Sequence, residues 1–292
     1  VDGELLDKWE ITTRKDEGGR YILDDISNSL TEKMEELHIE KSEVAGAGLG
    51  VPGPVKEDGT VLKCVNLGWG IFNVEEELSN IIGLPVKAGN DANMAALGEM
   101  WQGGGKGYDN IVMVTLGTGV GGGIILNGKM LSGVNGAGGE IGHMQVNEDE
   151  NEMCGCGKKG CLEQYTSATG IVHSANNELN NTDKPSKLRT VQYVSAKEIF
   201  DAAKEGDELA MLLVDKHGEC LGRALAQISC VVDPEVFVIG GGVSKAGDLL
   251  VDTTKKYFEK YVFHACKGTK FTLATLGNDA GIFGGAKAIL TK

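Results

Sequence analysis

Apolar residues recur along the chain with two different spacings, which alternate from one segment to the next. Ile22, Ile26, Leu30, Met34 and Leu37 show the three- and four-residue spacing of an amphipathic helix. Further helices are predicted over residues 74–82, 92–101, 195–205 and 208–231. Strands are predicted over residues 44–49, 86–89, 111–116, 124–126, 236–239 and 271–276, and a polar surface loop over 176–190. This alternation of helices and strands predicts an α/β fold.

The chain is long enough for two domains, with 292 residues of which 41% are hydrophobic. A glycine-rich string at 103–107 is the best candidate for the boundary or hinge between them. The net charge of -14 argues against a nucleic-acid partner, because a duplex binder needs a basic face. No apolar run reaches the roughly 18 residues of a membrane span, and nothing resembles a signal peptide. We therefore expect a cytoplasmic protein that binds neither nucleic acid nor a membrane.

The first residues carry a hairpin signal. Asp2-Gly3 precedes an alternating segment in which Leu5, Trp9 and Ile11 share one face. The strand that would pair with this segment from the upstream side is absent from the sequence. We expect the sequence to begin inside a longer protein, and an accidental Asp-Gly at a frayed end is the alternative.

Glycine accounts for 44 residues and clusters in loops. Residues 117–123 follow the strand predicted at 111–116, and residues 240–244 follow the strand predicted at 236–239. Either cluster could present backbone N–H groups to a phosphate, because glycine lets the main chain approach a ligand closely. Neither has the spacing of a Walker loop, and ordinary tight turns are the alternative. Ligands of α/β proteins bind at such strand ends, which favours the binding interpretation.

His143, Cys154, Cys156 and Cys161 lie close together in the sequence. Three cysteines and one histidine fill the tetrahedral coordination that zinc prefers, and they leave no open position for a reactive water. The glycines between the cysteines suit a tightly folded loop. The pattern predicts a structural zinc ion, with a disulfide or an iron–sulfur cluster as weaker alternatives. The other four cysteines are interpreted as buried or inert thiols.

An aspartate follows the strand predicted at 86–89. Asp91 at this position suits either the N-cap of the next helix or a catalytic carboxylate. Other polar side chains favour the second interpretation, because together they supply the carboxylate and amide groups that a polyhydroxylated substrate requires. These side chains are Asn66, Asn90, Glu140, His143 and Glu163, and Pro52 accompanies them.

Six motifs follow one another along nearly the whole chain. They are Gly-Val-Pro-Gly-Pro-Val at 50–55, Asn-Leu-Gly-Trp at 66–69, Asn-Asp-Ala-Asn at 90–93, Leu-Gly-Thr-Gly-Val-Gly-Gly-Gly at 116–123, Glu-Ile-Gly-His at 140–143 and Cys-Gly-Cys-Gly-x-x-Gly-Cys-x-Glu at 154–163. Their order and spacing resemble the ROK sugar kinases, and among these they are most similar to the bacterial glucokinases. The string Ala-Gly-Ile-Phe-Gly-Gly-Ala at 280–286 also resembles the last helix of the family.

The resemblance implies a two-lobed, actin-like (ribonuclease H-like) ATPase fold with a zinc knuckle. Residues 1–106 and 280–292 would form the small α/β lobe, and residues 107–279 the large α/β lobe with the zinc-binding loop. It also implies ATP-dependent phosphorylation of glucose at the 6-hydroxyl to glucose 6-phosphate, with Mg²⁺ accompanying ATP.

The resemblance further implies a role for each site residue. Asp91 would be the general base. The sugar hydroxyls would be held by Asn66, Asn90, Glu140, His143 and Glu163. The phosphates of ATP would contact Gly117, Thr118, Gly119 and Gly121, and the adenosine would lie on Gly240, Gly241 and Gly242. Zinc would bind His143, Cys154, Cys156 and Cys161, which leaves the second imidazole nitrogen of His143 for a sugar hydroxyl.

Other functions stay open. One is a kinase of another hexose, such as N-acetylmannosamine, mannose or fructose. Another is a sugar-sensing ROK transcriptional regulator, although no basic or helix-turn-helix-like segment occurs here. An actin-like or chaperone-type ATPase is disfavoured by the predicted zinc loop. The Asp-x-Gly-Gly-Thr phosphate loop of the family is missing, so we expect a chain that begins at Val1 to phosphorylate poorly. The family suggests a homodimer or a homotetramer.

Overall fold

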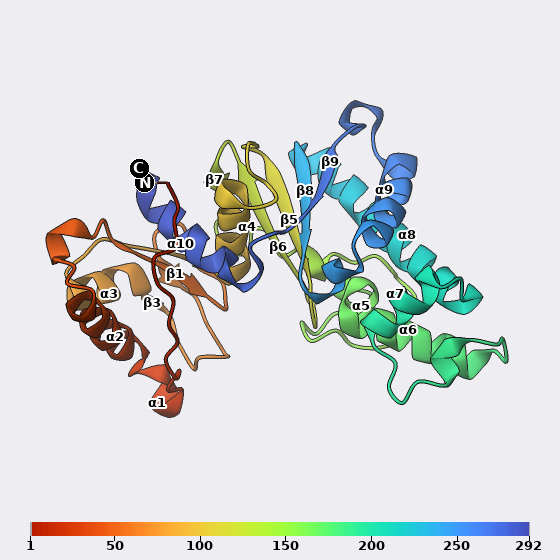
Figure 1. Ribbon diagram of the computed structural model, residues 1–292, viewed down its shortest axis with the longest axis horizontal. Coiled ribbons are helices and arrows are strands. Elements are labelled where there is room, and N and C mark those ends of the chain that lie inside the picture. Colours follow the sequence, from red (N-terminus) through yellow and green to blue (C-terminus); the bar gives the residue numbers. More distant parts are fainter. Residues whose placement is uncertain (1, 292) are drawn as a thin grey trace.

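A computed structural model describes residues 2–291 and confirms the α/β fold. Its larger part is built on a mixed sheet of β5 (Ile111–Leu116), β6 (Val120–Leu126), β7 (Lys129–Met130), β8 (Val236–Gly240) and β9 (Lys270–Leu273). The strand order is β7–β6–β5–β8–β9 (Figure 1). β5, β8 and β9 run parallel, whereas β6 runs antiparallel to β5 and β7.

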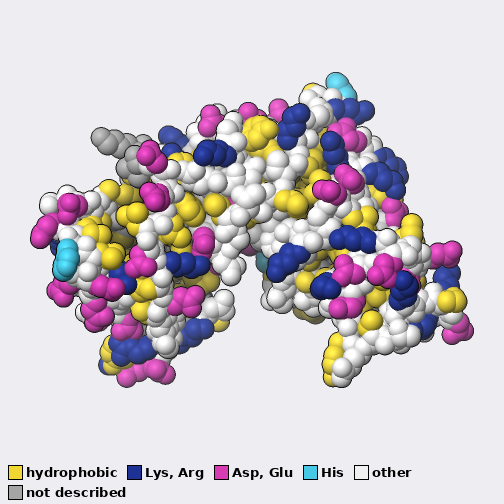
Figure 2. Space-filling model, viewed as in Figure 1, with side chains coloured by type: hydrophobic (Ala, Val, Ile, Leu, Met, Phe, Trp, Pro, Cys, Tyr) yellow, Lys and Arg dark blue, Asp and Glu magenta, His cyan; other side chains and the backbone are white. Residues whose placement is uncertain are grey.

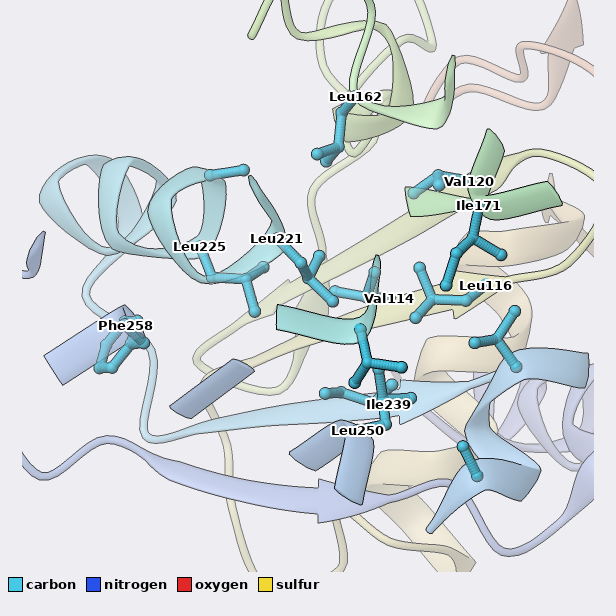
Figure 3. Packing of buried hydrophobic residues seen from close by; sticks show 14 of the residues in the cluster. Val114, Leu116, Val120, Leu162, Ile171, Leu221, Leu225, Ile239, Leu250 and Phe258 are labelled. Carbon is cyan, nitrogen blue, oxygen red and sulfur yellow. The ribbon is translucent and has the colours of Figure 1, made fainter. Parts of the chain in front are cut away.

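Both faces of this sheet are covered, which explains why its central strands are continuously apolar. On β5, Val114 and Leu116 point into one core, and Met113 points into a second core on the opposite face. Figure 3 shows Leu221 and Leu225 beside Val114 in the first core. The helices over this face are α5 (Glu163–Thr166), α6 (Ala168–Asn181), α7 (Ala196–Lys204), α8 (Glu208–Val232) and α9 (Asp248–Tyr261).

A smaller unit has a sheet and a core of its own. Its elements are α1 (Asp16–Gly19), α2 (Ile22–Glu36), β1 (Ala47–Val51), β2 (Thr60–Val61), β3 (Phe72–Asn73), α3 (Val74–Ile82) and β4 (Val86–Asn90). β1 pairs with β4 in parallel, so that Val51 lies beside Asn90. Leu23, Val74 and Leu78 are buried in the core. Parallel pairing places the carboxyl ends of β1 and β4 side by side, at the edge where α/β folds bind ligands.

Two helices, α4 (Asp91–Gln102) and α10 (Ala280–Leu290), join the smaller unit to the large sheet. They approach each other closely at glycines, because a Cβ atom on Gly98 or Gly284 would overlap with the backbone of the other helix. α4 also packs on β6, where a Cβ atom on Gly123 would come within 2.5 Å of Ala96 Cβ. α4 therefore contacts both units, and the lobe boundaries proposed at residues 106 and 280 stay a prediction.

The predicted helices and strands are confirmed, with ends that shift by a few residues. β6 begins at Val120, earlier than the predicted start at residue 124. The surface loop predicted over 176–190 is wrong in its first part, because α6 continues to Asn181. α9 was not among the predicted helices, although Leu250, Thr254 and Phe258 are buried at helical spacing along it.

Residues 2–15 form neither helix nor strand, so the strand that the hairpin signal predicted around Leu5, Trp9 and Ile11 is not formed in the described residues. This segment lies against two helices, α4 and α2. Gln102 Nε2 donates a hydrogen bond of 2.8 Å to the Asp2 carbonyl, and Trp9 Nε1 donates one of 2.8 Å to Ser29 Oγ. Across residues 2–291, none of the helices has both the length and the apolar character to cross a bilayer.

Candidate active site

A cleft of about 660 Å³ opens between the smaller unit and the large sheet. The cleft is lined by all six residues that were predicted to act in catalysis and sugar binding: Asn66, Asn90, Asp91, Glu140, His143 and Glu163. Of the predicted nucleotide-binding residues, four line the same cleft: Gly117, Gly119, Gly121 and Gly241. Figure 2 shows the hollow that separates the two halves of the molecule. The fold thus brings polar residues of both units together in one cleft.

The junction of β4 and α4 places two of these side chains. Asn90 is the N-cap of α4, because its Oδ1 atom accepts hydrogen bonds from Ala92 N (2.9 Å) and Asn93 N (3.2 Å). Asn90 Nδ2 also donates to the Gly53 carbonyl at 3.3 Å, which links the ends of β1 and β4. The alternative interpretation of Asp91 as the N-cap is therefore wrong.

Asp91 is the first residue of α4, and its side chain lies in the cleft. Its Oδ1 atom accepts a hydrogen bond of 2.8 Å from Ala92 N. Desolvation by the cleft walls raises the pKa of the Asp91 carboxyl, and this effect outweighs the hydrogen bonds from Ala92 N–H and from its own N–H, which lower it. A carboxylate with a raised pKa is a stronger proton acceptor than an ordinary aspartate.

The opposite wall carries an imidazole between two carboxylates. His143 ends a short 3₁₀ turn, Ile141–His143, which follows Glu140 directly. His143 Nε2 lies 4.0 Å from Glu140 Oε2, and His143 Nδ1 lies 3.6 Å from Glu163 Oε1. The two ring nitrogens therefore face different groups, as the dual role predicted for His143 requires.

The four predicted metal ligands form one cluster, with ligand atoms that all lie within 4.8 Å of one another. Cys154 Sγ lies 3.7 Å from His143 Nδ1, and Cys156 Sγ lies 3.6 Å from Cys161 Sγ. Zinc–sulfur bonds of about 2.3 Å and zinc–nitrogen bonds of about 2.0 Å place tetrahedral ligand atoms roughly 3.5 to 3.8 Å apart. The donor set and its spacing therefore fit zinc. The cysteines are free, so the disulfide alternative is wrong.

Side chains of α5 form hydrogen bonds with the cysteine loop and the residues beside it. Gln164 Oε1 accepts a hydrogen bond from Cys161 N (3.0 Å), and Gln164 Nε2 donates one to the Glu152 carbonyl (3.0 Å). Tyr165 Oη donates to Glu150 and accepts from Asn147 Nδ2. Glu163, the first residue of the same helix, is thereby fixed between the cluster and the cleft.

The first glycine cluster is shorter as a loop than the sequence predicted. Only residues 117–119 form the turn between β5 and β6, and Gly121 lies within β6. Gly117 N donates a hydrogen bond of 3.0 Å to the Gly119 carbonyl, so this N–H group serves the turn itself. Thr118 lies outside the cleft, in an adjoining pocket of about 420 Å³ that also contacts Gly119 and Glu163.

The three glycines of the second cluster, residues 240–242, lie in three different places. Gly241 lines the cleft with a positive φ of 83°, and a Cβ atom there would come within 2.5 Å of the Leu116 carbonyl oxygen. Gly240 ends β8 and does not line the cleft. Gly242 lines a separate pocket of about 160 Å³ with Phe200 and Val243. The structure therefore brings only Gly241 of this cluster to the cleft.

Sequence reasoning missed one polar residue of the cleft, Thr115. A hydroxyl residue near the end of an otherwise apolar strand was the available signal, since Ile111–Leu116 contains no other polar side chain. The contacts of Gln164 and Tyr165 had no comparable signal, because they depend on how α5 packs against the cysteine loop.

The fold and the cleft define a two-unit α/β protein with a cleft lined by polar residues of both units. The sequence matches the ROK family over residues 2–292, and the chain belongs to that family. It is 46% identical over 290 residues to the glucokinase of Halalkalibacterium halodurans, covering 97% of this chain and 87% of that protein.

Two solved structures show the same architecture. A ROK family glucokinase from Streptomyces griseus, in complex with glucose and AMPPNP, matches with a TM-score of 0.74 and 32% identity, over 98% of this chain and 92% of that chain. A ROK family transcriptional regulator, a homologue of the E. coli MLC protein, matches with a TM-score of 0.79 and 28% identity, over 92% of this chain and 67% of that chain. The family therefore includes both catalysts and regulators on this fold.

Proposed function

We propose that the protein is a glucokinase that transfers the γ-phosphoryl group of ATP to the 6-hydroxyl of glucose. The observation that carries this proposal is the cleft, in which Asp91 lies with Asn66 and Asn90 on one side and with Glu140, His143 and Glu163 on the other. The high identity to the H. halodurans glucokinase and the likeness to the S. griseus enzyme support the same reaction. Phosphoryl transfer needs mainly positioning and charge stabilisation, which this arrangement can supply.

Asp91 would accept the proton of the 6-hydroxyl as the oxygen attacks phosphorus. Its position at the start of α4 keeps the carboxylate in place, because Ala92 N–H binds one of its oxygens. Asn66 and Asn90 would bind sugar hydroxyls from the same side. Glu140, His143 Nε2 and Glu163 would bind them from the other side, with carboxylates as acceptors and the imidazole as a donor.

The nucleotide would lie along the glycine turns. Gly119, Gly121 and Gly241 line the cleft and would let the phosphates approach the backbone. We propose that Thr118, Gly240 and Gly242 contact the nucleotide from the adjoining surfaces, where Gly242 borders an apolar pocket suited to a flat base. Mg²⁺ bound with ATP supplies neutralising charge at the transferring group.

The cluster of His143, Cys154, Cys156 and Cys161 would hold a structural zinc ion. Burial raises the pKa of the Cys154 thiol to about 12, so the thiolate in such a site must be stabilised by the ion itself. With all four positions filled by protein, the ion would supply no reactive water. Its effect would be on the positions of His143 and Glu163 at the cleft.

The test is an assay of the purified full-length protein with ATP against glucose, mannose, fructose and N-acetylmannosamine. We expect glucose to give the highest kcat/KM, with glucose 6-phosphate as the product. A higher kcat/KM for another hexose would instead establish that kinase activity. Sugar binding without turnover of any hexose would favour the regulator, a function supported by the structural match to a ROK transcriptional regulator.

We further propose a lobe division at residues 106 and 280, and assembly as a homodimer or homotetramer. Proteolysis at the proposed boundaries and light scattering coupled to size-exclusion chromatography test these two points. We place the protein in the cytoplasm because a zinc site with three thiolates needs a compartment that keeps cysteines reduced.

A further inference from the structure

Glu99 is fully buried in the middle of the molecule, with a relative exposure of 0%. Its carboxylate accepts backbone hydrogen bonds from Gly104 N (2.7 Å), Thr275 N (3.1 Å) and Leu276 N (2.8 Å). None of the ion pairs found among residues 2–291 includes Glu99. A buried charge is costly unless it is compensated, so the three N–H groups are what keeps this carboxylate in the interior.

The donors come from the two stretches of chain that connect the units. Residues 103–110 lead from α4 into the large sheet, and residues 274–279 lead from the large sheet back to α10. Gly104 belongs to the first connection, and Thr275 and Leu276 belong to the second. One side chain therefore fastens both connections at the same point.

The first connection also contacts the end of β9, directly before the second connection begins. Thr272 Oγ1 donates a hydrogen bond of 2.9 Å to the Gly104 carbonyl. A Cβ atom on Gly104 would overlap with the Leu273 carbonyl oxygen, and one on Gly103 would overlap with the Glu99 carboxylate. Glycine at position 104 lets the first connection pass close to β9, and glycine at position 103 leaves room for the Glu99 carboxylate.

We propose that Glu99 makes the two connections a single joint that holds α4 in one position on the large sheet, with which α4 shares a buried core. Asp91 and Glu99 lie on the same helix, eight residues or about 12 Å apart. The joint therefore sets where the carboxylate of Asp91 stands relative to Glu163 on the opposite wall. Glu99 is thus a positioning residue for Asp91, a role that rests on the proposed kinase function for its effect on turnover.

Glu99→Gln tests the joint, because one carboxylate oxygen becomes an NH₂ group that cannot accept the backbone N–H groups. Glu75→Gln is the matched control. Glu75 is also largely buried and accepts a backbone hydrogen bond from Ala88 N at 2.8 Å, and it pairs with Lys87 Nζ at 3.1 Å, all within the smaller unit. Each variant therefore loses a buried carboxylate, and only Glu99→Gln loosens the connections.

The first measurement is amide hydrogen exchange, which requires no substrate. In Glu99→Gln we expect protection at Gly104, Thr275 and Leu276 to fall together by at least about tenfold. In Glu75→Gln these three amides should keep wild-type protection. Faster exchange at Gly104 alone, with Thr275 and Leu276 unchanged, would show that the connections are independent and would overturn the proposal.

The second measurement is hexose kinetics. A shift of α4 would displace Asp91 together with Asn90 at the start of the helix, so we expect Glu99→Gln to lower kcat about tenfold and to raise the glucose KM several-fold. Glu75→Gln should stay within about twofold of wild type in both. Equal losses of kcat and equal rises of KM in the two variants would show that Glu99 only stabilises the fold and does not position Asp91. If the wild-type protein phosphorylates no hexose, the proposed function fails, and the exchange measurement still decides whether the joint exists.

If Glu99→Gln does not fold, Thr272→Val provides a milder change. This substitution removes only the hydrogen bond to the Gly104 carbonyl and keeps the shape of the side chain. Exchange should rise at Gly104, Thr275 and Leu276 together, by a smaller factor than in Glu99→Gln. A rise confined to one of the two connections would again contradict a single joint.

Discussion

The Oε2 atom of Glu163 lies 2.6 Å from the position that a Cβ atom would take on Gly119. The other carboxylate oxygen of Glu163 accepts a hydrogen bond of 2.8 Å from Cys154 Sγ. Glu163 thus stands between the turn that joins β5 to β6 and the cysteine cluster. Glycine at position 119 leaves room for the carboxylate at the edge of the cleft.

Gly119→Ala should displace the Glu163 carboxylate while leaving the fold intact, because the obstructing atom is the far end of a flexible side chain. We expect the glucose KM to rise about tenfold, which corresponds to about 1.4 kcal/mol of binding free energy. Gly281→Ala is the control, since a Cβ atom there meets nothing within 4 Å. A normal glucose KM in Gly119→Ala would show that Glu163 does not bind the sugar.

Asp91→Asn should abolish most turnover and leave glucose binding nearly unchanged. An amide cannot accept the hydroxyl proton, and loss of a general base typically costs a factor of about 10² to 10⁴ in rate. Single-turnover kinetics and glucose titration separate the two effects. Asp248→Asn is the control, because Asp248 also begins a helix, α9, outside the cleft. Retention of more than about a tenth of the wild-type kcat would contradict the base assignment.

The pH dependence should follow the Asp91 carboxyl. Because desolvation raises its pKa above the ordinary 3.8, kcat/KM should fall with decreasing pH earlier than an ordinary aspartate would allow. Compared with the unfolded chain, the folded protein binds the proton on Asp91 more tightly. The contribution of this group to the free energy of unfolding is therefore fully present below pH 3.8 and is lost as the pH rises through the raised pKa.

The same shift predicts the stability of the variant. At pH 7 the wild-type protein bears the cost of the ionised, partly desolvated carboxylate, whereas Asp91→Asn does not. Asp91→Asn should therefore melt at a slightly higher temperature than wild type at pH 7, and the difference should shrink as the pH is lowered toward 3.8. Thermal unfolding at a series of pH values measures this, and an equal or lower melting temperature for the variant at pH 7 would refute it.

Cys156→Ser should remove zinc and weaken glucose binding together. Cys156 is exposed, so its substitution disturbs little packing, but it supplies one of the four ligand atoms. We expect about one zinc ion per wild-type chain and almost none in the variant, with a glucose Kd at least about tenfold higher. Cys230→Ser is matched, since Cys230 is exposed but lies outside the cluster. Loss of zinc with an unchanged glucose Kd would leave the ion without a role at the cleft.

Much of this site can be predicted from the sequence because several residues of each cleft wall lie close together along the chain. Asn90 and Asp91 follow a strand and begin a helix, so their place at a sheet edge can be predicted from periodicity alone. The metal ligands lie within one short segment, and the chemistry of cysteine and histidine indicates their partner. What periodicity could not decide was whether Asp91 caps the helix, and the structure assigns that cap to Asn90.

Other features depend on packing between distant segments and leave no local signal. Gly121 and Gly123 read as part of a phosphate loop, yet they lie in β6, where Gly123 makes room for α4. Glu99 looks like an ordinary helical glutamate until the two connections fold over it. Residues 176–181 are rich in asparagine and read as a loop, but the Ser167 N-cap and the buried Ile171 and Ala175 favour a helix there.

His217 gives a prediction that concerns stability alone. Its Nε2 atom donates a hydrogen bond of 2.9 Å to the Thr166 carbonyl, while Nδ1 is buried without a partner among the described residues. Burial lowers the pKa of His217 to about 4 from an ordinary 6.5. The unfolded chain therefore takes up a proton on this residue at higher pH than the folded protein does. The stability from the neutral imidazole is complete above pH 6.5 and is lost as pH falls from 6.5 to about 4.

The loss over that window should reach about 3 kcal/mol of the free energy of unfolding, since each pKa unit corresponds to about 1.4 kcal/mol. His217→Gln keeps an N–H donor for the Thr166 carbonyl and does not titrate, so its urea-unfolding free energy should vary much less between pH 6.5 and 4.5. His264→Gln, at an exposed position, should retain the wild-type slope. A His217→Gln slope equal to that of the wild type would mean that the imidazole of His217 takes up its proton in the folded protein as easily as in the unfolded chain, which its complete burial does not favour.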